Sequence, residues 1–410
     1  MIISWGGNER LLRVRTDARK KNLFAEIALT YWLVSAIVIL EKNSTGDFIM
    51  KLLIGADTVP TSVTEELFVK GDAGALFGDI CKLASEADRV VINLECALTD
   101  SDGAIKKFGP NIKCTPGCVN GIKALGVTDV MLSNNHVFDF GKKGLLDTLA
   151  ALDEAGLPYT GVGENDTDSR RSYYIEKDGK KIGIVNVCEH EYTYALPNRM
   201  GANPFDPFLT MQDIRETKKN CDYLICIYHG GKEYCRYPSP RLYNICHEMV
   251  LCGADVVLCQ HSHCIGCYEQ FEGGHIVYGQ GNFNFVFAGY DCPECWYTSL
   301  LVELNIDDGV SIKFHPIVAT ETGCDLARGA KAAEIMNAFE ARNAQLLDGT
   351  WRDGWHDFCI HPDRSYYHDS ILKEKVTEQD IHRFAHYLDC EAHTDVWREL
   401  YPTWNMTNEL

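Results

Sequence analysis

From residue 51 onward, short runs of apolar and β-branched residues alternate with longer segments in which apolar residues recur every three or four positions. The short runs predict buried strands, and the longer segments predict amphipathic helices. Helices are expected over residues 142–155, where four leucines share this spacing, and over residues 241–252. The predicted strands cover residues 52–54, 89–94, 129–132, 223–228 and 255–260.

This alternation of strands and helices predicts βαβ units with largely parallel strands. Two hairpins interrupt it, one over residues 173–187 that turns at Asp178-Gly179 and one over residues 299–315 that turns at Asp308-Gly309. An Asp-Gly pair between two strand-like runs is a strong hairpin signal. Parallel units combined with antiparallel hairpins predict an α/β protein in which two stacked sheets carry helices on their outer faces.

The character of the chain changes after residue 324. A helix is predicted over residues 330–347, and the remainder is rich in tryptophan, tyrosine, histidine and acidic residues with little strand signal. We therefore expect three parts: residues 1–49, a catalytic-type α/β domain over residues 50–324, and a helical C-terminal appendage over residues 325–410.

The first 49 residues allow two interpretations. Residues 23–40 are largely apolar and follow several arginines and lysines, which is the pattern of a membrane anchor. Glu26 lies inside this stretch, however, and Tyr31 and Trp32 lie at its middle rather than at its edges. We favour the alternative that the protein starts at Met50, which predicts a cytoplasmic location and no membrane contact.

Composition narrows the classes of function. The chain has 410 residues, 46% of them hydrophobic, and a net charge of −19. Because nucleic-acid backbones are bound through an excess of lysine and arginine, nucleic acid is not an expected partner. The 18 cysteines are interpreted as reduced, small apolar side chains. An alternative is a zinc ribbon, whose four ligands would be Cys264, Cys267, Cys292 and Cys295.

Polar clusters follow five of the predicted strands directly. The clusters are Gly55-Ala56-Asp57, Asn93-Leu94-Glu95, Ser133-Asn134-Asn135-His136 with Asp139, His229-Gly230-Gly231 with Glu233, and His261-Ser262-His263. In open α/β sheets, ligands bind beyond the carboxyl ends of the strands. A single histidine or asparagine at such a position is usually structural, but five clusters at successive strand ends are expected to converge on one site.

The donor types indicate a metal site. Carboxylate, amide and imidazole groups without thiolates suit manganese, iron or zinc ions. The two histidines of His261-Ser262-His263 occupy alternate positions, so on an extended segment both would face the same side.

The order of these clusters, together with His-Gly-Gly-x-Glu-Tyr and Gly-Asn-Phe, resembles the capsule synthesis protein CapA family. That family is associated with poly-γ-glutamate biosynthesis and is a branch of the calcineurin-like metallophosphoesterases. The resemblance covers residues 51–319, and it implies a four-layer α/β/β/α metallophosphoesterase-like sandwich.

The resemblance also implies the roles of individual residues. It implies that two divalent metal ions (Mn, Fe or Zn) are held by Asp57, Glu95, Asn135, His229, His261 and His263. His136 would be the catalytic imidazole and Asp139 the residue that orients it. One departure is that Thr58-Val59 follows Asp57, where ordinary phosphoesterases have a histidine two positions after the aspartate.

Substrate contacts are predicted from charged residues beside these clusters: Lys107, Glu233, Arg236 and Arg241. In an acidic chain, cations at this position would bind a phosphoester or an anionic polymer. The sequence therefore supports two hypotheses of function. The first is a metal-dependent hydrolase of a phosphoester or related bond, linked to capsule synthesis. The second is a non-catalytic metal-binding protein that assists the synthesis or export of an anionic polymer.

Overall fold

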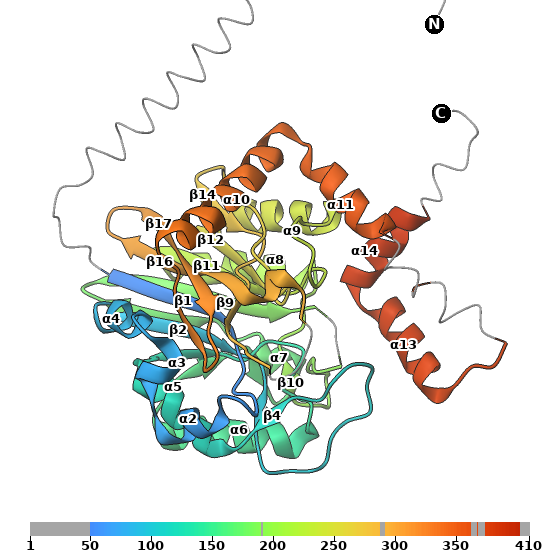
Figure 1. Cartoon of the computed structure of the whole chain (residues 1–410), viewed down its shortest axis with the longest axis horizontal. Coiled ribbons are helices and arrows are strands. Elements are labelled where there is room, and N and C mark those ends of the chain that lie inside the picture. Colours follow the sequence, from blue (N-terminus) through green and yellow to red (C-terminus); the bar gives the residue numbers. More distant parts are fainter. Residues whose placement is uncertain (1–49, 190–191, 288–291, 362–366, 368–373, 402–410) are drawn as a thin grey trace, which may run out of the picture. The chain divides into compact units, whose positions relative to one another are not determined.

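Two β-sheets packed face to face form the centre of the computed structural model, which describes residues 50–189, 192–287, 292–361, 367 and 374–401 (Figure 1). The chain divides into residues 1–47 and residues 48–410, and every described residue belongs to the second unit. Both interpretations of residues 1–49 therefore concern residues outside the described part. Within that part, no helix has the length and apolar character needed to cross a membrane.

The first sheet has the strand order β18-β17-β16-β1-β2-β5-β6, and β15 pairs with the end of β1. The strands β1, β2, β5 and β6 run parallel to one another, whereas β16 is antiparallel to β1. The strands of this sheet are β1 (Met50–Thr58), β2 (Arg89–Leu94), β5 (Asp129–Met131), β6 (Tyr159–Thr160), β15 (Asn282–Asn284), β16 (Thr298–Ile306), β17 (Val310–Ala319) and β18 (Cys324–Leu326).

The second sheet has the strand order β13-β14-β12-β11-β9-β8. Its strands are β8 (Tyr173–Lys177), β9 (Lys180–Cys188), β11 (Tyr223–His229), β12 (Val256–Gln260), β13 (Tyr268–Phe271) and β14 (Gly274–Val277). Two short ribbons lie outside the sheets: β3 (Ala97–Leu98) with β4 (Lys113–Cys114), and β7 (Val162–Gly163) with β10 (Gly201–Ala202).

Alternate apolar residues of both sheets fill the space between them. Leu52 and Ile54 of the first sheet share one buried cluster with Ile225, Ile227 and Leu258 of the second. Because each of these strands has a helix-covered outer face as well, almost all of its residues are buried.

Helices cover the outer faces of both sheets. The helices on the first sheet are α2 (Glu65–Lys70), α3 (Ala73–Phe77), α4 (Ile80–Ser85), α5 (Val119–Leu125) and α6 (Gly141–Ala155). The second sheet is covered by α8 (Leu209–Lys218) and α9 (Pro240–Leu251), and the short α7 (Asp166–Ser169) packs on β7. The predicted four-layer α/β/β/α sandwich is thereby confirmed.

The predicted helical C-terminal region is also present. It consists of α10 (Gly329–Asp348), α11 (Trp351–Ile360), α13 (Glu378–Asp389) and α14 (Glu391–Leu400). Helix α10 packs on β13 and β17, while α11, α13 and α14 share a buried cluster that includes Trp355, Tyr387 and Val396. Helix α13 begins with a capping box in which Thr377 and Asp380 bond each other's backbone N–H groups.

One predicted strand boundary is wrong in a way that concerns the site. The first strand was expected to end at Ile54, but β1 continues to Thr58 after an irregularity in its register with β2 between Ile54 and Asp57. Gly55 lies in this irregular stretch against the ring of Phe283, where an added Cβ would lie 2.8 Å from the ring carbons. The continuation lets β15 pair with Asp57 and Thr58, which brings Asn282 beside Asp57.

Candidate metal centre

The polar clusters at the strand ends converge as the sequence predicts. Asp57 lies in β1, Glu95 follows β2, His229 ends β11, and His261 and His263 follow β12. All five residues are buried. Their ligand atoms form three overlapping groups, within each of which the atoms lie at most 4.8 Å apart: Asp57 with Glu95 and His263, Glu95 with His229 and His261, and Glu233 with His261 and His263.

Glu95 is shared by two of these groups, and its carboxyl group pairs with no lysine or arginine among the described residues; His229 Nε2 lies 3.3 Å from its Oε1. Both of its oxygens are buried and accept no hydrogen bond in the described structure. Burial, and then the nearby Asp57 carboxylate, raise the pKa of Glu95 to about 8. A buried carboxylate without a donor or cation is strongly destabilising. A divalent cation at this position would compensate the charge, so the residues present fit a metal site.

His229 has the protonation state that metal binding requires. Burial lowers the pKa of His229 to about 3, so its imidazole is neutral and retains a lone pair for a metal. Its Nε2 lies 2.9 Å from Asn135 Oδ1 and 3.3 Å from Glu95 Oε1. The amide of Asn135 therefore reaches the same point as two of the other predicted ligands.

His261 and His263 adopt a backbone conformation that the sequence does not predict. Instead of forming an extended segment, they have φ angles of 83° and 53°, in the left-handed region that residues other than glycine rarely adopt. Such strain is concentrated at functional sites. The turn directs the His261 backbone N–H to Asp57 Oδ2 at 3.0 Å and places His263 Nδ1 2.8 Å from Asn282 Oδ1.

Two asparagines that were not predicted as functional residues hold Asp57 in place. Asn93 donates from Nδ2 to Asp57 Oδ1 at 2.8 Å, and Asn134 donates to Asn93 Oδ1 at 3.0 Å. Both belong to polar clusters identified in the sequence. The direction of the chain at the end of each strand determines which member of a cluster faces the metal ligands, and the sequence pattern does not give that direction. Hydrogen bonds of this kind fix the orientation of ligands around a metal.

His136 and Asp139 are brought together with Lys107. His136 Nδ1 lies 2.6 Å from Asp139 Oδ2, and Lys107 Nζ lies 2.5 Å from Asp139 Oδ1. The bond to the carboxylate places the proton on Nδ1 of the imidazole, so that Nε2 is the ring nitrogen available to a ligand. The Lys107 side chain is only 3% exposed. Its ammonium therefore compensates Asp139, and the predicted role of Lys107 becomes that of a positioning residue.

A cavity of about 530 Å³ adjoins the cluster. Its lining includes Asn135, His136 and His263 from the strand ends and Arg383 and His386 from α13. The C-terminal helices therefore contribute directly to the space next to the metal centre, which was not expected from the sequence.

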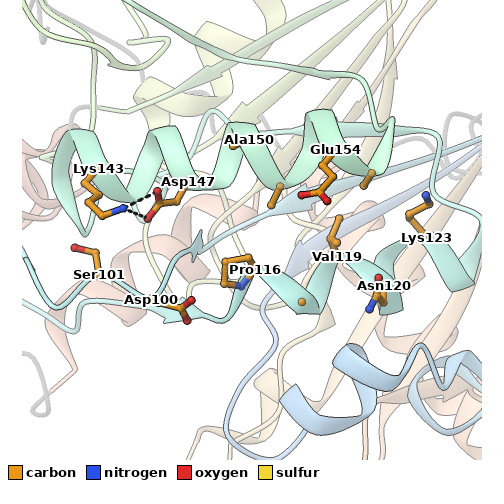
Figure 2. Close-up of a pocket in the computed structure, with 13 residues that line it drawn as sticks. Asp100, Ser101, Pro116, Val119, Asn120, Lys123, Lys143, Asp147, Ala150 and Glu154 are labelled. Atoms are coloured by element: carbon orange, nitrogen blue, oxygen red, sulfur yellow. Dashed lines mark hydrogen bonds and ion pairs between the residues drawn. The ribbon is translucent and has the colours of Figure 1, made fainter.

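A second cavity, of about 740 Å³, lies between α6 and the segment formed by η1 (Pro116–Cys118) and α5 (Figure 2). Its only ionic contact is the Lys143–Asp147 pair at 2.8 Å, and no histidine lines it. Glu233 and His263, which belong to one of the three ligand groups, line the smaller cavity and not this one.

The other three residues predicted to contact substrate differ in their position relative to the cavity. Glu233 lines the cavity and also belongs to a ligand group with His261 and His263. Arg236 does not line the cavity, and its backbone carbonyl accepts the Cys267 thiol at 3.5 Å. Arg241 is not in the cavity either, because its guanidinium bridges Glu189 and Asp395. The predicted substrate roles of Arg236 and Arg241 are thus not supported by their positions.

The Arg241 bridge ties the His229 loop to the C-terminal helices. Glu189 also accepts hydrogen bonds from Tyr228 at 2.5 Å and from the Gly231 N–H at 3.0 Å, beside His229. On the other side, Asp395 of α14 accepts from Arg241 Nε at 2.8 Å. The pKa of Glu189 is lowered despite its burial because Arg241 lies against it.

Replacing Arg241 with alanine is expected to lower the free energy of unfolding by about 3 kcal/mol, because Glu189 and Asp395 would remain buried without their cation. Urea unfolding measures this change. The matched control is Arg215→Ala, whose arginine pairs with Glu248 at the surface, with both side chains about half exposed. An exposed pair contributes about 1 kcal/mol or less. Equal losses in the two variants would contradict the assigned role of Arg241.

The zinc-ribbon alternative is not supported by the described residues. None of the groups that could hold a metal contains a cysteine. Cys264 instead donates its thiol to the Cys235 carbonyl at 3.2 Å. The structure forms no disulfide among the cysteines it describes, and most of them are buried.

Comparison with known proteins supports the family resemblance. Residues 43–287 match the sequence profile of a family described as "Bacterial capsule synthesis protein PGA_cap". The chain is 32% identical over 173 residues to "Capsule biosynthesis protein CapA" of Bacillus anthracis, a match that covers 41% of this chain and 42% of that protein. It is 26% identical over 294 residues to "PGA biosynthesis protein CapA" of Bacillus subtilis, covering 68% of this chain and 77% of that protein.

Solved structures with similar folds are more distant. A phosphatase from Mycoplasma pneumoniae has 16% identity and a TM-score of 0.43, covering 66% of this chain and 93% of that one. A 5'-nucleotidase described as putative, from Staphylococcus aureus, has 16% identity and a TM-score of 0.40, covering 71% and 58%. The profile match, by contrast, spans more than half of the chain and includes every residue of the metal centre described above. The chain therefore belongs to the PGA_cap family of bacterial capsule synthesis proteins.

Proposed function

We propose that the chain is a metal-dependent hydrolase that acts on a phosphoester or a related bond in the synthesis of a capsular polymer such as poly-γ-glutamate. The observation that carries this proposal is the buried Glu95 carboxyl group, whose oxygens accept no hydrogen bond in the described structure and which belongs to two overlapping ligand groups. The two divalent ions (Mn, Fe or Zn) would be held by Asp57, Glu95, Asn135, His229, His261 and His263. Two such ions, when bound, polarise the phosphoryl group and activate a water for attack.

The protein's own residues supply orientation and proton transfer. Asn93 and Asn134 fix the carboxylate of Asp57, so the ligand geometry is set before substrate binds. Asp139 fixes the ring of His136. In its imidazolium form, with a proton on each ring nitrogen, His136 would donate the Nε2 proton to the leaving oxygen as the bond from phosphorus to that oxygen breaks, and would be left as the imidazole with its proton on Nδ1. Lys107 pairs with Asp139 and holds it in position.

The absence of a histidine in the first motif favours the second hypothesis, a non-catalytic accessory protein. Val59, which occupies that position two residues after Asp57, is a buried apolar side chain that cannot bind a metal. Glu233 offers a replacement donor, because its carboxylate lies within 4.8 Å of ligand atoms of both His261 and His263. Because Glu233 can take the place of the missing histidine as a metal ligand, we prefer the hydrolase to the non-catalytic accessory protein.

Hydrolysis of p-nitrophenyl phosphate and bis(p-nitrophenyl) phosphate distinguishes the two hypotheses. The purified protein supplied with Mn²⁺ is expected to release p-nitrophenol, and a chelator should remove this activity because the proposed reaction depends on bound ions. Release no faster than in the chelated sample, for both esters and with Mn²⁺, Fe²⁺ and Zn²⁺ tried in turn, would leave the accessory role as the better account.

A further inference from the structure

The cations that line the cavity beside the metal centre differ in whether they have an acidic partner. Lys107 is paired with Asp139. Lys232 and Arg383 also line the cavity, yet neither forms an ion pair with any acidic residue that the structure describes. Lys232 is buried and directly precedes Glu233, so it lies at the metal end of the cavity. Arg383 comes from α13, more than 300 residues later in the sequence than Asp57 of the first ligand cluster.

Arg383 is placed by aromatic contacts rather than by a carboxylate. Its guanidinium carbon lies 5.0 Å from the centroid of the Phe108 ring. Its Nε is buried and makes no hydrogen bond within the described part of the chain. A cation–π contact stabilises a guanidinium but provides no acceptor for its N–H groups. The buried Nε of Arg383 therefore retains a hydrogen-bonding capacity that an anionic group in the cavity would satisfy.

Helix α13 is held against the loop that carries Lys107 and Phe108. Lys106 Nζ lies 3.1 Å from Glu378 Oε1 at the start of α13. Farther along the helix, the His386 ring lies 5.5 Å from the Phe108 ring and is stacked on Tyr192 at 5.8 Å. These contacts define one wall of the cavity that is aromatic and carries the Arg383 cation.

We propose that Arg383 binds a second anionic group, a carboxylate or a phosphate, on the part of the substrate that is not the scissile phosphoester. The planar guanidinium pairs with either anion through two parallel hydrogen bonds. The aromatic wall between Arg383 and the metal ligands would contact a flat or apolar segment that links the two anionic groups. The proposal rests on the proposed function, because it takes the metal end of the cavity as the site of the phosphoryl group.

The proposal is tested by binding rather than by turnover. Phenylphosphonate cannot be hydrolysed, and 4-carboxyphenylphosphonate and 1,4-phenylenediphosphonate add one anionic group to it. The measurement is calorimetric titration of the Mn²⁺-loaded protein with each probe. The dissociation constant of at least one of the two doubly anionic probes is expected to be about tenfold or more below that of phenylphosphonate, which is the effect of one charge-assisted hydrogen-bonded pair. Tighter binding of 4-carboxyphenylphosphonate would identify the second anionic group as a carboxylate, and tighter binding of 1,4-phenylenediphosphonate would identify it as a phosphate.

The Arg383→Gln variant should lose this preference while keeping the wild-type affinity for phenylphosphonate. Arg383→Lys should restore part of it, because the charge returns without the planar fork. Arg352→Gln, which changes an exposed arginine of α11 outside the cavity, should leave it intact. A wild-type protein without the preference, or a preference that survives Arg383→Gln, would overturn the proposal.

The outcomes separate this proposal from the proposed function. An Arg383-dependent preference in a protein that hydrolyses no phosphoester would support the second anion site and contradict the hydrolase. Hydrolysis of simple phosphoesters with no preference among the phosphonates would support the hydrolase and overturn the second anion site.

Discussion

If the chain is the proposed hydrolase, replacing Glu95 with glutamine is expected to lower kcat/KM for phosphoester hydrolysis by about 10³-fold or more, because the site would lose the carboxylate that two of its ligand groups share. Glutamine keeps the size of the side chain but cannot carry the negative charge that balances two cations. Added Mn²⁺ is expected to raise the melting temperature of the wild-type protein and to have much less effect on this variant. Activity and thermal unfolding, with and without Mn²⁺, are the two measurements.

The same substitution should have the opposite effect on the metal-free protein. Burial and Asp57 raise the pKa of Glu95 to about 8, above the ordinary value of 4.5. A carboxyl group with a raised pKa in the folded state supports stability below pH 4.5, and that support is lost as the pH rises towards 8. At pH 8 the chelated Glu95→Gln variant should therefore melt at a higher temperature than the chelated wild type.

Glu303 provides a control of opposite sign on the same sheet. A hydrogen bond from His315 lowers the pKa of Glu303 to about 2, so its ionised form contributes stability above pH 4.5 that is lost as the pH falls towards 2. Glu303→Gln should therefore destabilise the protein at pH 8 and leave the metal response intact. If both variants shifted stability in the same direction, the account of Glu95 would be wrong.

Replacing His136 with alanine is expected to lower kcat by about 10²- to 10⁴-fold, the usual contribution of a positioned general acid. Because His136 belongs to none of the three ligand groups, the affinity for Mn²⁺ should change little. The loss should be smallest for p-nitrophenyl esters, whose leaving group needs little protonation, and larger for alkyl phosphoesters.

The control for this variant is His356→Ala, which removes a half-exposed histidine paired with Glu399 on α14 and should leave kcat unchanged. Comparing the two leaving groups separates a catalytic role from a structural one. A loss that is equal for p-nitrophenyl and alkyl esters, or one that accompanies loss of metal, would remove His136 from the proton-transfer step.

The positions of the ligand clusters could be predicted from the sequence because parallel strands present their carboxyl ends on one edge of a sheet. Asp57, Glu95, His229 and His261 come from four different strands of two sheets, and each was found from its own local pattern. The convergence of two sheets on one site follows from the four-layer packing, which the alternation of strands and helices predicts.

Contacts between distant parts of the chain could not be predicted from local sequence patterns. Arg241 follows Glu233 closely and was interpreted as a substrate contact, but its partners Glu189 and Asp395 lie 52 and 154 positions away. The same reason applies to Arg383, which lies in the C-terminal region where no motif marks a functional residue. Local patterns report which face of an element is buried but not which distant charge it meets.

The sequence patterns also did not predict two details of the backbone conformation at the site. The left-handed conformation at His261 and His263 is stabilised by contacts with Asp57 and Asn282, which come from other strands. The extension of β1 to Thr58 depends in turn on pairing with β15, more than 200 residues later in the sequence. In both cases, tertiary contacts override the preference of the local sequence.

The number of divalent ions bound per chain tests the central claim most directly. Calorimetric titration of the chelator-treated protein with Mn²⁺ is predicted to give two ions per chain for the wild type, because Glu95 belongs to two overlapping ligand groups. Glu95→Gln should bind at most one. Binding of fewer than two ions by the wild type, or of two ions by both proteins, would contradict a dinuclear centre built around Glu95.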